Sequence, residues 1–326
     1  MSPGPGRQTP EPGGRLEWIA LAWGAQLGPV GFHGLVARFG SPRAVSEAGE
    51  AALRESGVRL TEEQLPRILL GMDDLLAVEE EIERLSEEGV QVVCPGEEGY
   101  PSAIAELPHP PPVLCLRGEW RPEDLLAVAV VGTRSPSREG LALAEEVGEA
   151  LARGGVTVVS GLARGIDAAA HWGALAGGGR TVAVLGSGIR VIHPTVNVPL
   201  AREIGQRGAL VSELSPSARP SVRTLMARNR LQSALSKAVL VVESGEQGGS
   251  LQTAAAARRQ GRLLLAVDWP TAGLTSAGTR KLLLKGALPF RGLGDVPGLI
   301  DLVRMDAPAS PGRHAAGTGD GQLPLF

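Results

Sequence analysis

The chain has 326 residues, of which 43% are hydrophobic and 21% are charged, so we expect a folded protein large enough for two domains. This composition excludes a largely disordered chain, and the sequence contains no apolar run of the length of a membrane span or a secretory signal. Cys94 and Cys115 are the two cysteines, which excludes a disulfide framework, and no Cys/His/Asp cluster has metal spacing. We therefore predict a cytoplasmic protein that uses no membrane contact, metal or cofactor.

The net charge of -3 combines two regions of opposite charge. Residues 1–126 contain 10 basic and 21 acidic residues (net -11), residues 127–301 contain 20 and 12 (net +8), and the last 25 contain two of each. Because three of the 32 basic residues are lysine, 29 are arginine, whose planar guanidinium suits phosphate. GC-rich genomes also enrich arginine, so the charge favours a nucleic-acid partner only modestly.

The first part of the chain is predicted to be helical. Residues 1–14 are rich in Pro and Gly and are predicted to be disordered, and Gly and Pro punctuate helical patterns from Leu16 to Glu88. These patterns predict a small helical domain over residues 15–95, similar to a SAM or helix-hairpin-helix domain. The turn Leu27–Gly31 has the shape of a hairpin whose amides hold a DNA phosphate, but its acidic surroundings favour a plain packing module. Residues 96–125 are predicted to be a connecting segment.

From Leu126 onward, short apolar runs alternate with helical stretches. Continuous apolar strands separated by single helices predict a parallel sheet covered on both faces, that is, a doubly wound, Rossmann-like α/β domain over residues 126–302. The predicted strands are 126–132, 156–161, 181–186, 209–213, 238–244 and 263–268, and the predicted helices are 138–153, 166–176, 197–206, 229–236 and 250–260. Residues 303–326 are predicted to be a flexible tail.

In a sheet of this kind, ligands bind beyond the carboxyl ends of the strands, and four of the loops there are rich in glycine. Glycine lets backbone amides approach a ligand, and the following helix offers free N–H groups to an anion. Arg228-Asn229-Arg230 stands at the expected start of another helix, where two arginines oppose the helix dipole unless an anion offsets them. The four loops are 132–135, 160–167, 186–188 and 243–250.

Other chemistries fit the sequence poorly. The lysines at 237, 281 and 285 follow no GxxxxG loop, which excludes a Walker A site, and the loop at 186–191 lacks the third glycine of the dinucleotide fingerprint. Asp167 and His171 share a helix face at the spacing of an acid–base pair. A structural contact that anchors the helix to the sheet is the favoured interpretation of this pair.

Several stretches carry a resemblance to a known family: VAVVGTRSPSREG (128–140), VVSGLARGIDAAAHWGAL (158–175), TVAVLGSGIRVIHPTVN (181–197), ARNRLQSALSKAVLVVE (227–243) and GGSLQTA (248–254). Together with TSAGTRKLLLKGA (275–287) and GYPSAIAELPHPPPVLCLRG (99–118), they resemble the DNA-processing protein A (DprA/Smf) family over about residues 16–301. Members of this family are not known as enzymes. They bind and protect single-stranded DNA independently of sequence, load the RecA recombinase during natural transformation (competence) and recombination, and form homodimers.

The resemblance and the glycine-rich loops together define the candidate DNA-binding residues. Arginines and backbone amides can hold a phosphate chain without reading bases. Leu225 and Met226 stand where the family usually has Phe-Pro, so an aromatic residue for base stacking is absent there. The candidates are Gly132, Thr133, Arg134, Ser160, Gly161, Arg164, Gly186, Ser187, Arg228, Asn229, Arg230, Gly249, Ser250 and Thr253.

Two other function classes remain open. One is a Rossmann-like nucleotide-binding enzyme resembling the phosphoribohydrolases, but the GGSLQTA loop lacks the glutamate that follows the corresponding loop of those enzymes. The other is a scaffold that recruits recombination proteins.

The C-terminus ends in Gln322-Leu323-Pro324-Leu325-Phe326 after a polar tail. Gln322, Leu323, Leu325 and Phe326 resemble the QLxLF peptides by which bacterial replication and repair proteins bind the DNA polymerase sliding clamp. A proline at the variable position stiffens the extended form and lowers the ordering cost of binding. An end that frays or packs on its own domain is the alternative.

Overall fold

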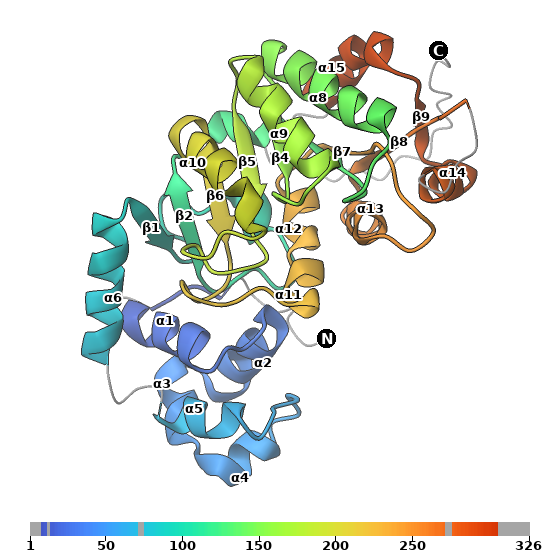
Figure 1. The fold of residues 1–326 in the computed structure, drawn as a ribbon. Helices are drawn as coiled ribbons and strands as arrows, with labels where there is room; N and C mark the ends of the chain where they lie inside the picture. The colour runs from blue at the N-terminus through green and yellow to red at the C-terminus, as the bar shows by residue number, and fades with distance from the viewer. Residues whose placement is uncertain (1–7, 12–13, 71–74, 271–275, 306–326) are drawn as a thin grey trace.

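Figure 1 shows the computed structural model, which describes residues 8–11, 14–70, 75–270 and 276–305. Most of the predicted disordered N-terminus (residues 1–7 and 12–13) and the tail with its QLPLF end (306–326) lie outside the described residues. No described helix has the length and apolar character needed to cross a membrane.

Within the described residues, nine strands form a single sheet in the order β1-β2-β6-β5-β4-β3-β7-β8-β9. The strands from β6 to β9 in that order run parallel, whereas β1–β2 and β2–β6 pair antiparallel. The strands are β1 (Val90–Val93), β2 (Leu114–Gly118), β3 (Ala127–Val131), β4 (Thr157–Ser160), β5 (Thr181–Val184), β6 (Ala209–Ser212), β7 (Ala238–Val241), β8 (Leu263–Val267) and β9 (Leu288–Phe290). The doubly wound Rossmann-like fold predicted from the sequence is confirmed.

Helices cover both faces of the sheet because its side chains alternate between two apolar cores. Val128 and Val130 face one core, with α8, α9 and α15, whereas Ala129 and Val131 face the other, with α12, α13 and α14. The helices of this domain are α7 (Ser102–Ala105), α8 (Arg138–Arg153), α9 (Ile166–Ala176), α10 (Val198–Arg207), α11 (Val222–Ala227), α12 (Asn229–Ala234), α13 (Gly249–Arg259), α14 (Ala277–Leu284) and α15 (Val296–Met305).

Local sequence explains where the main helices begin and how closely they pack. The hydroxyl of Ser137 accepts a hydrogen bond from the amide of Gly140 and caps α8. Gly148 of α8 and Gly173 of α9 lie against backbone of the opposite helix, where a Cβ atom would collide with a carbonyl oxygen. The bounds of α8 and α9 agree with the predicted 138–153 and 166–176 to the residue.

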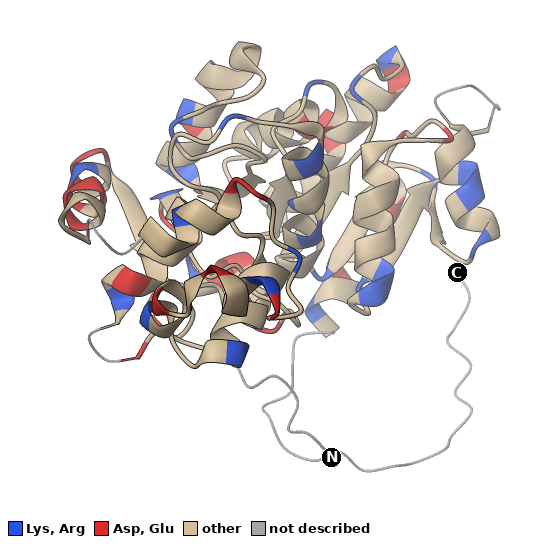
Figure 2. Cartoon of the chain, turned by 90° about the horizontal axis from the view of Figure 1, so that it is seen from below, with Lys and Arg blue, Asp and Glu red and all other residues tan. Residues whose placement is uncertain are grey.

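The N-terminal helices pack against the sheet rather than forming a detached body (Figure 1). Their core is built around Trp18 and Phe32, whose rings meet edge to face at 4.7 Å, and it continues into Leu185 and Ile189 beyond the carboxyl end of β5. The helices are α1 (Arg15–Gly24), α2 (Pro29–Phe39), α3 (Pro42–Glu47), α4 (Gly49–Arg54), α5 (Gln64–Leu70) and α6 (Leu75–Glu87). Acidic residues line α6, at the left of Figure 2.

The structure corrects the prediction that residues 96–125 are only a connecting segment. It supplies β2, which pairs with both β1 and β6, so the sheet extends beyond the predicted domain boundary. The two strands β1 and β2 are as short as the central strands, and they lack the alternation with long single helices that marked the central strands. The helix predicted over 229–236 ends at Ala234, and α11 (Val222–Ala227) was not predicted.

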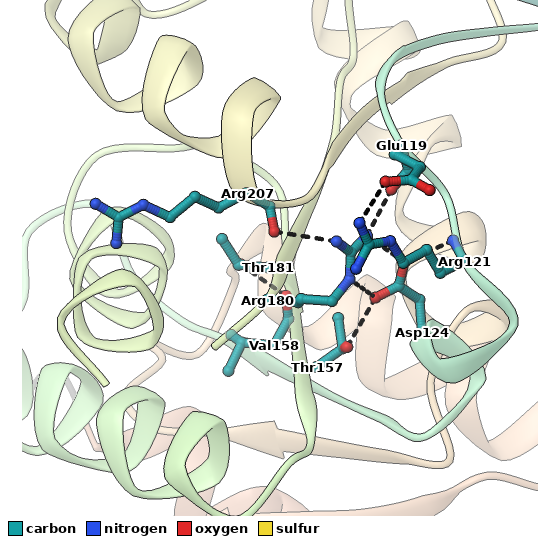
Figure 3. Close-up of polar contacts among 8 residues, drawn as sticks. All are labelled: Glu119, Arg121, Asp124, Thr157, Val158, Arg180, Thr181 and Arg207. Carbon is teal, nitrogen blue, oxygen red and sulfur yellow. Dashed lines mark hydrogen bonds and ion pairs between the residues drawn. The ribbon is translucent and has the colours of Figure 1, made fainter. Parts of the chain in front are cut away.

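A cluster at the amino end of the parallel strands fixes the sheet (Figure 3). Arg180 donates two hydrogen bonds to the fully buried carboxylate of Asp124, each 2.8 Å long, and Asp124 also accepts one from Thr157. Two backbone carbonyls, those of Glu119 and Arg207, accept from the same guanidinium. This end of the sheet is therefore tied by saturated polar contacts, and the opposite end is where the glycine-rich loops gather.

Candidate functional site

A groove lies where the strand order reverses, between β3 and its neighbour β7. It consists of two adjoining cavities that share Arg134, Ala163, Leu225 and Arg228 in their walls. The switch-point cavity, about 450 Å³, lies between residues 131–134, 244–250 and α11. The Arg164 cavity, about 360 Å³, lies between residues 134–135, 161–164 and 193–194. Three of the four glycine-rich loops, at 132–135, 160–167 and 243–250, therefore meet at this groove.

Arg228 is the central residue of this groove, and its side chain is only 5% exposed. Its Nη2 donates to the carbonyl of Gly161 at 3.0 Å and lies 4.0 Å from the carboxylate of Asp167. Its Nε and Nη1 have no partner among the residues that the structure describes. Burial lowers the pKa of Arg228 to about 10, although Asp167 acts in the opposite direction. A buried guanidinium with two idle donors is poorly compensated until an anion reaches it.

The loop after β4 holds this guanidinium in place. Asp167, at the start of α9, accepts hydrogen bonds from the amides of Gly161 and Ala163, which pulls the loop against the helix. Leu162 between them is fully buried with φ 59°, a conformation that costs a non-glycine residue about 1–3 kcal/mol. The guanidinium of Arg228 lies across Gly161, where any Cβ atom would occupy its position. Gly161 is thus required for Arg228, not only for loop flexibility.

His171 and Asp167 do not hydrogen-bond each other, but each anchors α9. The Thr181 hydroxyl donates to the carbonyl of Val158 at 2.7 Å, so the Nδ1–H of His171 must donate to Thr181 Oγ1, at 2.6 Å. Burial, with a contribution from Arg228, lowers the pKa of His171 to about 3, and the ring is neutral in the folded protein. Burial raises the pKa of Asp167, while Arg228 and the loop amides oppose that shift. The structural interpretation of this pair is the one the contacts support.

Exposed cations and helix-end donors surround Arg228. Arg134 and Arg164 are exposed at the groove, on the loops after β3 and β4. Gly132 and Thr133 line the switch-point cavity, as do residues at the start of α13. Those residues are connected to one another: Asn229 donates to the carbonyl of Gly249 at 3.1 Å, and the hydroxyls of Ser250 and Thr253 bond Ser244 and Gln232.

Glu243 supports the groove, and the sequence reasoning missed it. Its buried carboxylate accepts hydrogen bonds from the amide (2.8 Å) and hydroxyl (2.5 Å) of Ser137 at the start of α8, and its carbonyl accepts one from the amide of Thr133 (2.8 Å). These bonds connect the loops after β3 and β7 across the switch point. An acidic residue at the end of a strand, opposite a predicted helix start, is the signal that could have indicated this role.

Four predicted residues lie outside the groove walls. Arg230 forms an ion pair with the buried Glu213 and lines neither cavity, because residues two apart on a helix point to opposite sides. Gly186 and Ser187 are covered by α11: Gly186 lies against Leu225, and the Ser187 hydroxyl donates to the carbonyl of Val191. Ser160 is fully buried and donates to the carbonyl of Val130. The expectation that these four residues line the pocket is corrected.

The short helix α11 forms the roof of the groove. Leu225 lines both cavities, whereas Met226 and Val222 line the switch-point cavity and are 41% and 81% exposed. Leu225 and Met226 are the positions at which the family usually has Phe-Pro and this chain lacks the aromatic residue. The roof therefore presents aliphatic surface to whatever lies in the groove.

A doubly wound sheet with a poorly compensated arginine at its switch point, and further arginines beside it, defines a Rossmann-like protein with a basic groove. Its family follows from comparison with known proteins. A family model described as DNA recombination-mediator protein A matches residues 91–298, and the chain belongs to that family.

Relatives of this chain include proteins named Smf and DprA. It is 34% identical over 244 residues to protein Smf of Synechocystis sp. (73% of this chain, 60% of the relative) and 41% identical over 192 residues to protein Smf of Escherichia coli (59% and 51%). It is 34% identical over 205 residues to DNA processing protein DprA of Bacillus subtilis (62% and 68%). The matched regions thus span about half to two thirds of these relatives.

Two solved structures of the same kind resemble the fold. The X-ray structure of DNA processing protein A from Streptococcus pneumoniae superposes with a TM-score of 0.71 at 28% identity, covering 87% of this chain and 97% of that one. DNA processing protein A from Helicobacter pylori, described with a unique single-stranded DNA binding mode, superposes with a TM-score of 0.58 at 30% identity, covering 67% and 96%.

Proposed function

We propose that this protein binds single-stranded DNA, independently of sequence, along the groove between β3 and β7. The observation that carries the proposal is Arg228, a buried guanidinium in the groove wall with two donors that no described residue uses. A phosphate oxygen satisfies such donors with charge-assisted hydrogen bonds. Arg134 and Arg164 extend the same chemistry along the groove without contributing contacts that read bases.

A single strand fits this groove better than a duplex. Arg228 lies in the walls of two adjoining cavities, and one flexible backbone can follow the path that they form. A rigid duplex presents its phosphates on a broad cylinder and cannot follow such a path. The description of the Helicobacter pylori relative as a single-stranded DNA binder supports the same conclusion.

Binding without catalysis is the role that the groove supports. Asp167 is the one carboxylate among the described residues that line the two cavities, and its oxygens are engaged by loop amides. A nucleotide-cleaving enzyme needs a carboxylate free to act on substrate or water. The phosphoribohydrolase-like alternative therefore has no candidate residue in these walls.

The partners that we propose follow from family membership and from the C-terminal sequence. They are the RecA recombinase, loaded onto strands that this protein protects during natural transformation and recombination, and a second copy of the chain in a homodimer. The sliding clamp is proposed as the target of Gln322, Leu323, Leu325 and Phe326. Recruitment of these proteins without strand binding, the scaffold alternative, makes no use of Arg228.

Fluorescence anisotropy with single-stranded, duplex and mononucleotide ligands tests the proposed function. We expect preference for the single strand, strong weakening with salt, and loss of affinity in Arg134→Ala, whose side chain is exposed at the groove. Arg153→Ala is the matched control, because Arg153 is an exposed arginine at the far end of α8. Equal affinity for blunt duplex, or equal losses in the two variants, would contradict the proposal.

A further inference from the structure

The two cavities of the groove differ in charge. The switch-point cavity contains Arg134, Arg228 and Asp167, a formal sum of +1. The Arg164 cavity contains Arg134, Arg164 and Arg228, a formal sum of +3, and no Asp or Glu is present among its described lining residues. Arg134 and Arg228 are common to both cavities, so the two cavities together contain three arginines and Asp167, which lies 4.0 Å from Arg228, and their combined formal sum is +2.

The Arg164 cavity, which has three arginines and no carboxylate of its own, suits a more highly charged phosphate group than the switch-point cavity does. A phosphodiester within a strand carries one negative charge and suits the switch-point cavity. A terminal phosphomonoester carries about -1.5 to -2 near pH 7 and has three free oxygens. Only the terminal group has enough charge and acceptors for three guanidiniums.

We infer that the Arg164 cavity binds the terminal phosphomonoester of a DNA strand. This inference rests on the proposed function and specifies its substrate as a strand with a phosphorylated end. Arg228 lies in the wall common to both cavities, so a strand in the switch-point cavity can place its end beside Arg164. The exposed Ser135 adds a hydroxyl donor on the same side.

The roof of the groove is consistent with an end-binding site. Leu225 stands between the two cavities and lines both, so the path beneath it is bounded by an apolar side chain above and by the guanidinium of Arg228. Arg228 lines the cavity on either side of Leu225. Arg164, which lines the second cavity only, distinguishes the terminal phosphate from the internal ones.

Competition binding with matched oligonucleotides of about 12 nucleotides tests this inference. The competitors share one sequence and carry hydroxyls at both ends, a 5′-phosphate, a 3′-phosphate, or the same phosphates capped as monomethyl esters. We expect one phosphorylated end to bind about 10-fold more tightly than the hydroxyl end, equivalent to about 1.4 kcal/mol. The methyl cap, which removes one charge but keeps the shape, should abolish the gain. The end that gives the gain identifies the polarity of the strand.

Variants separate this inference from the proposed function. Arg164→Ala should abolish the gain from the terminal phosphate, whereas the control Arg153→Ala should retain it. Unchanged single-strand binding with no gain from either phosphate, or a gain that persists in Arg164→Ala, overturns the end-binding site alone. Absence of binding to any single strand overturns the proposed function as well.

Discussion

Replacing Arg228 by methionine should impair DNA binding while leaving the stability of the fold almost unchanged. Methionine retains the length and apolar body of the side chain and removes the buried charge. The change removes two unpaired donors, Nε and Nη1, and each unpaired donor lowers the free energy of unfolding by about 1–3 kcal/mol. It also loses the hydrogen bond to the Gly161 carbonyl and the attraction to Asp167 at 4.0 Å.

These effects nearly cancel. The lost attraction is at most about 4 kcal/mol at an effective dielectric constant of about 20, and the lost hydrogen bond is about 1.5–3 kcal/mol. Removing the two unpaired donors stabilises the folded protein by about 2–6 kcal/mol. We expect a net change within about 1 kcal/mol, a melting shift of a few degrees, and at least a 30-fold loss of single-strand affinity for about 2 kcal/mol of lost phosphate contact.

Replacing the other partner of this ion pair, in Asp167→Ala, should instead destabilise the fold. It leaves the amides of Gly161 and Ala163 without their acceptor and Arg228 without a counter-charge, which should destabilise the protein by about 3–5 kcal/mol. Urea denaturation and anisotropy on both variants measure the contrast. If Arg228→Met unfolds as readily as Asp167→Ala, the arginine is a structural residue and the reasoning about its idle donors is refuted.

Three other outcomes can be measured separately. Arg180→Ala should lower the free energy of unfolding by about 3 kcal/mol because it strands the buried carboxylate of Asp124, whereas the exposed pair of Arg153 should contribute less than about 1 kcal/mol. The lowered pKa of His171 means that its contribution to stability is complete above about pH 6.5 and is lost as pH falls toward 3, by about 1.4 kcal/mol per unit, a slope that His171→Asn should remove. A labelled peptide of residues 317–326 should bind purified sliding clamp at micromolar concentration, and binding that survives deletion of Leu325 and the final residue would reject the clamp motif.

Hydrophobic periodicity predicted the central fold well because the parallel strands are buried on both faces. Continuous apolar runs such as 127–131 are unambiguous when single helices separate them. The strands β1 and β2, which extend the sheet by antiparallel pairing, were missed although they are as long as the central strands. Pairing with distant strands, rather than local propensity, determines their structure.

Glycine was the least reliable guide to the site. Gly161 leaves room for the guanidinium of Arg228, whereas Gly186 leaves room for Leu225 of the roof helix. The two follow neighbouring strands in the same way, so the sequence pattern cannot distinguish a glycine that admits a ligand group from one that admits another segment of the chain. The helical period alone, in contrast, separates Arg228 from Arg230.

The burial of Arg228 explains how affinity and sequence independence can coexist. Exposed arginines gain little from a phosphate because water competes for both partners, so a site made only from Arg134 and Arg164 would bind weakly. A guanidinium already stripped of water gains more from the same phosphate, because the desolvation cost was met when the chain folded. Asp167 and the strained Leu162 hold the guanidinium in its buried position, and neither residue has to contact DNA. In the proposed complex with DNA, affinity thus resides in the backbone phosphate, and the aliphatic roof of α11 accepts any base.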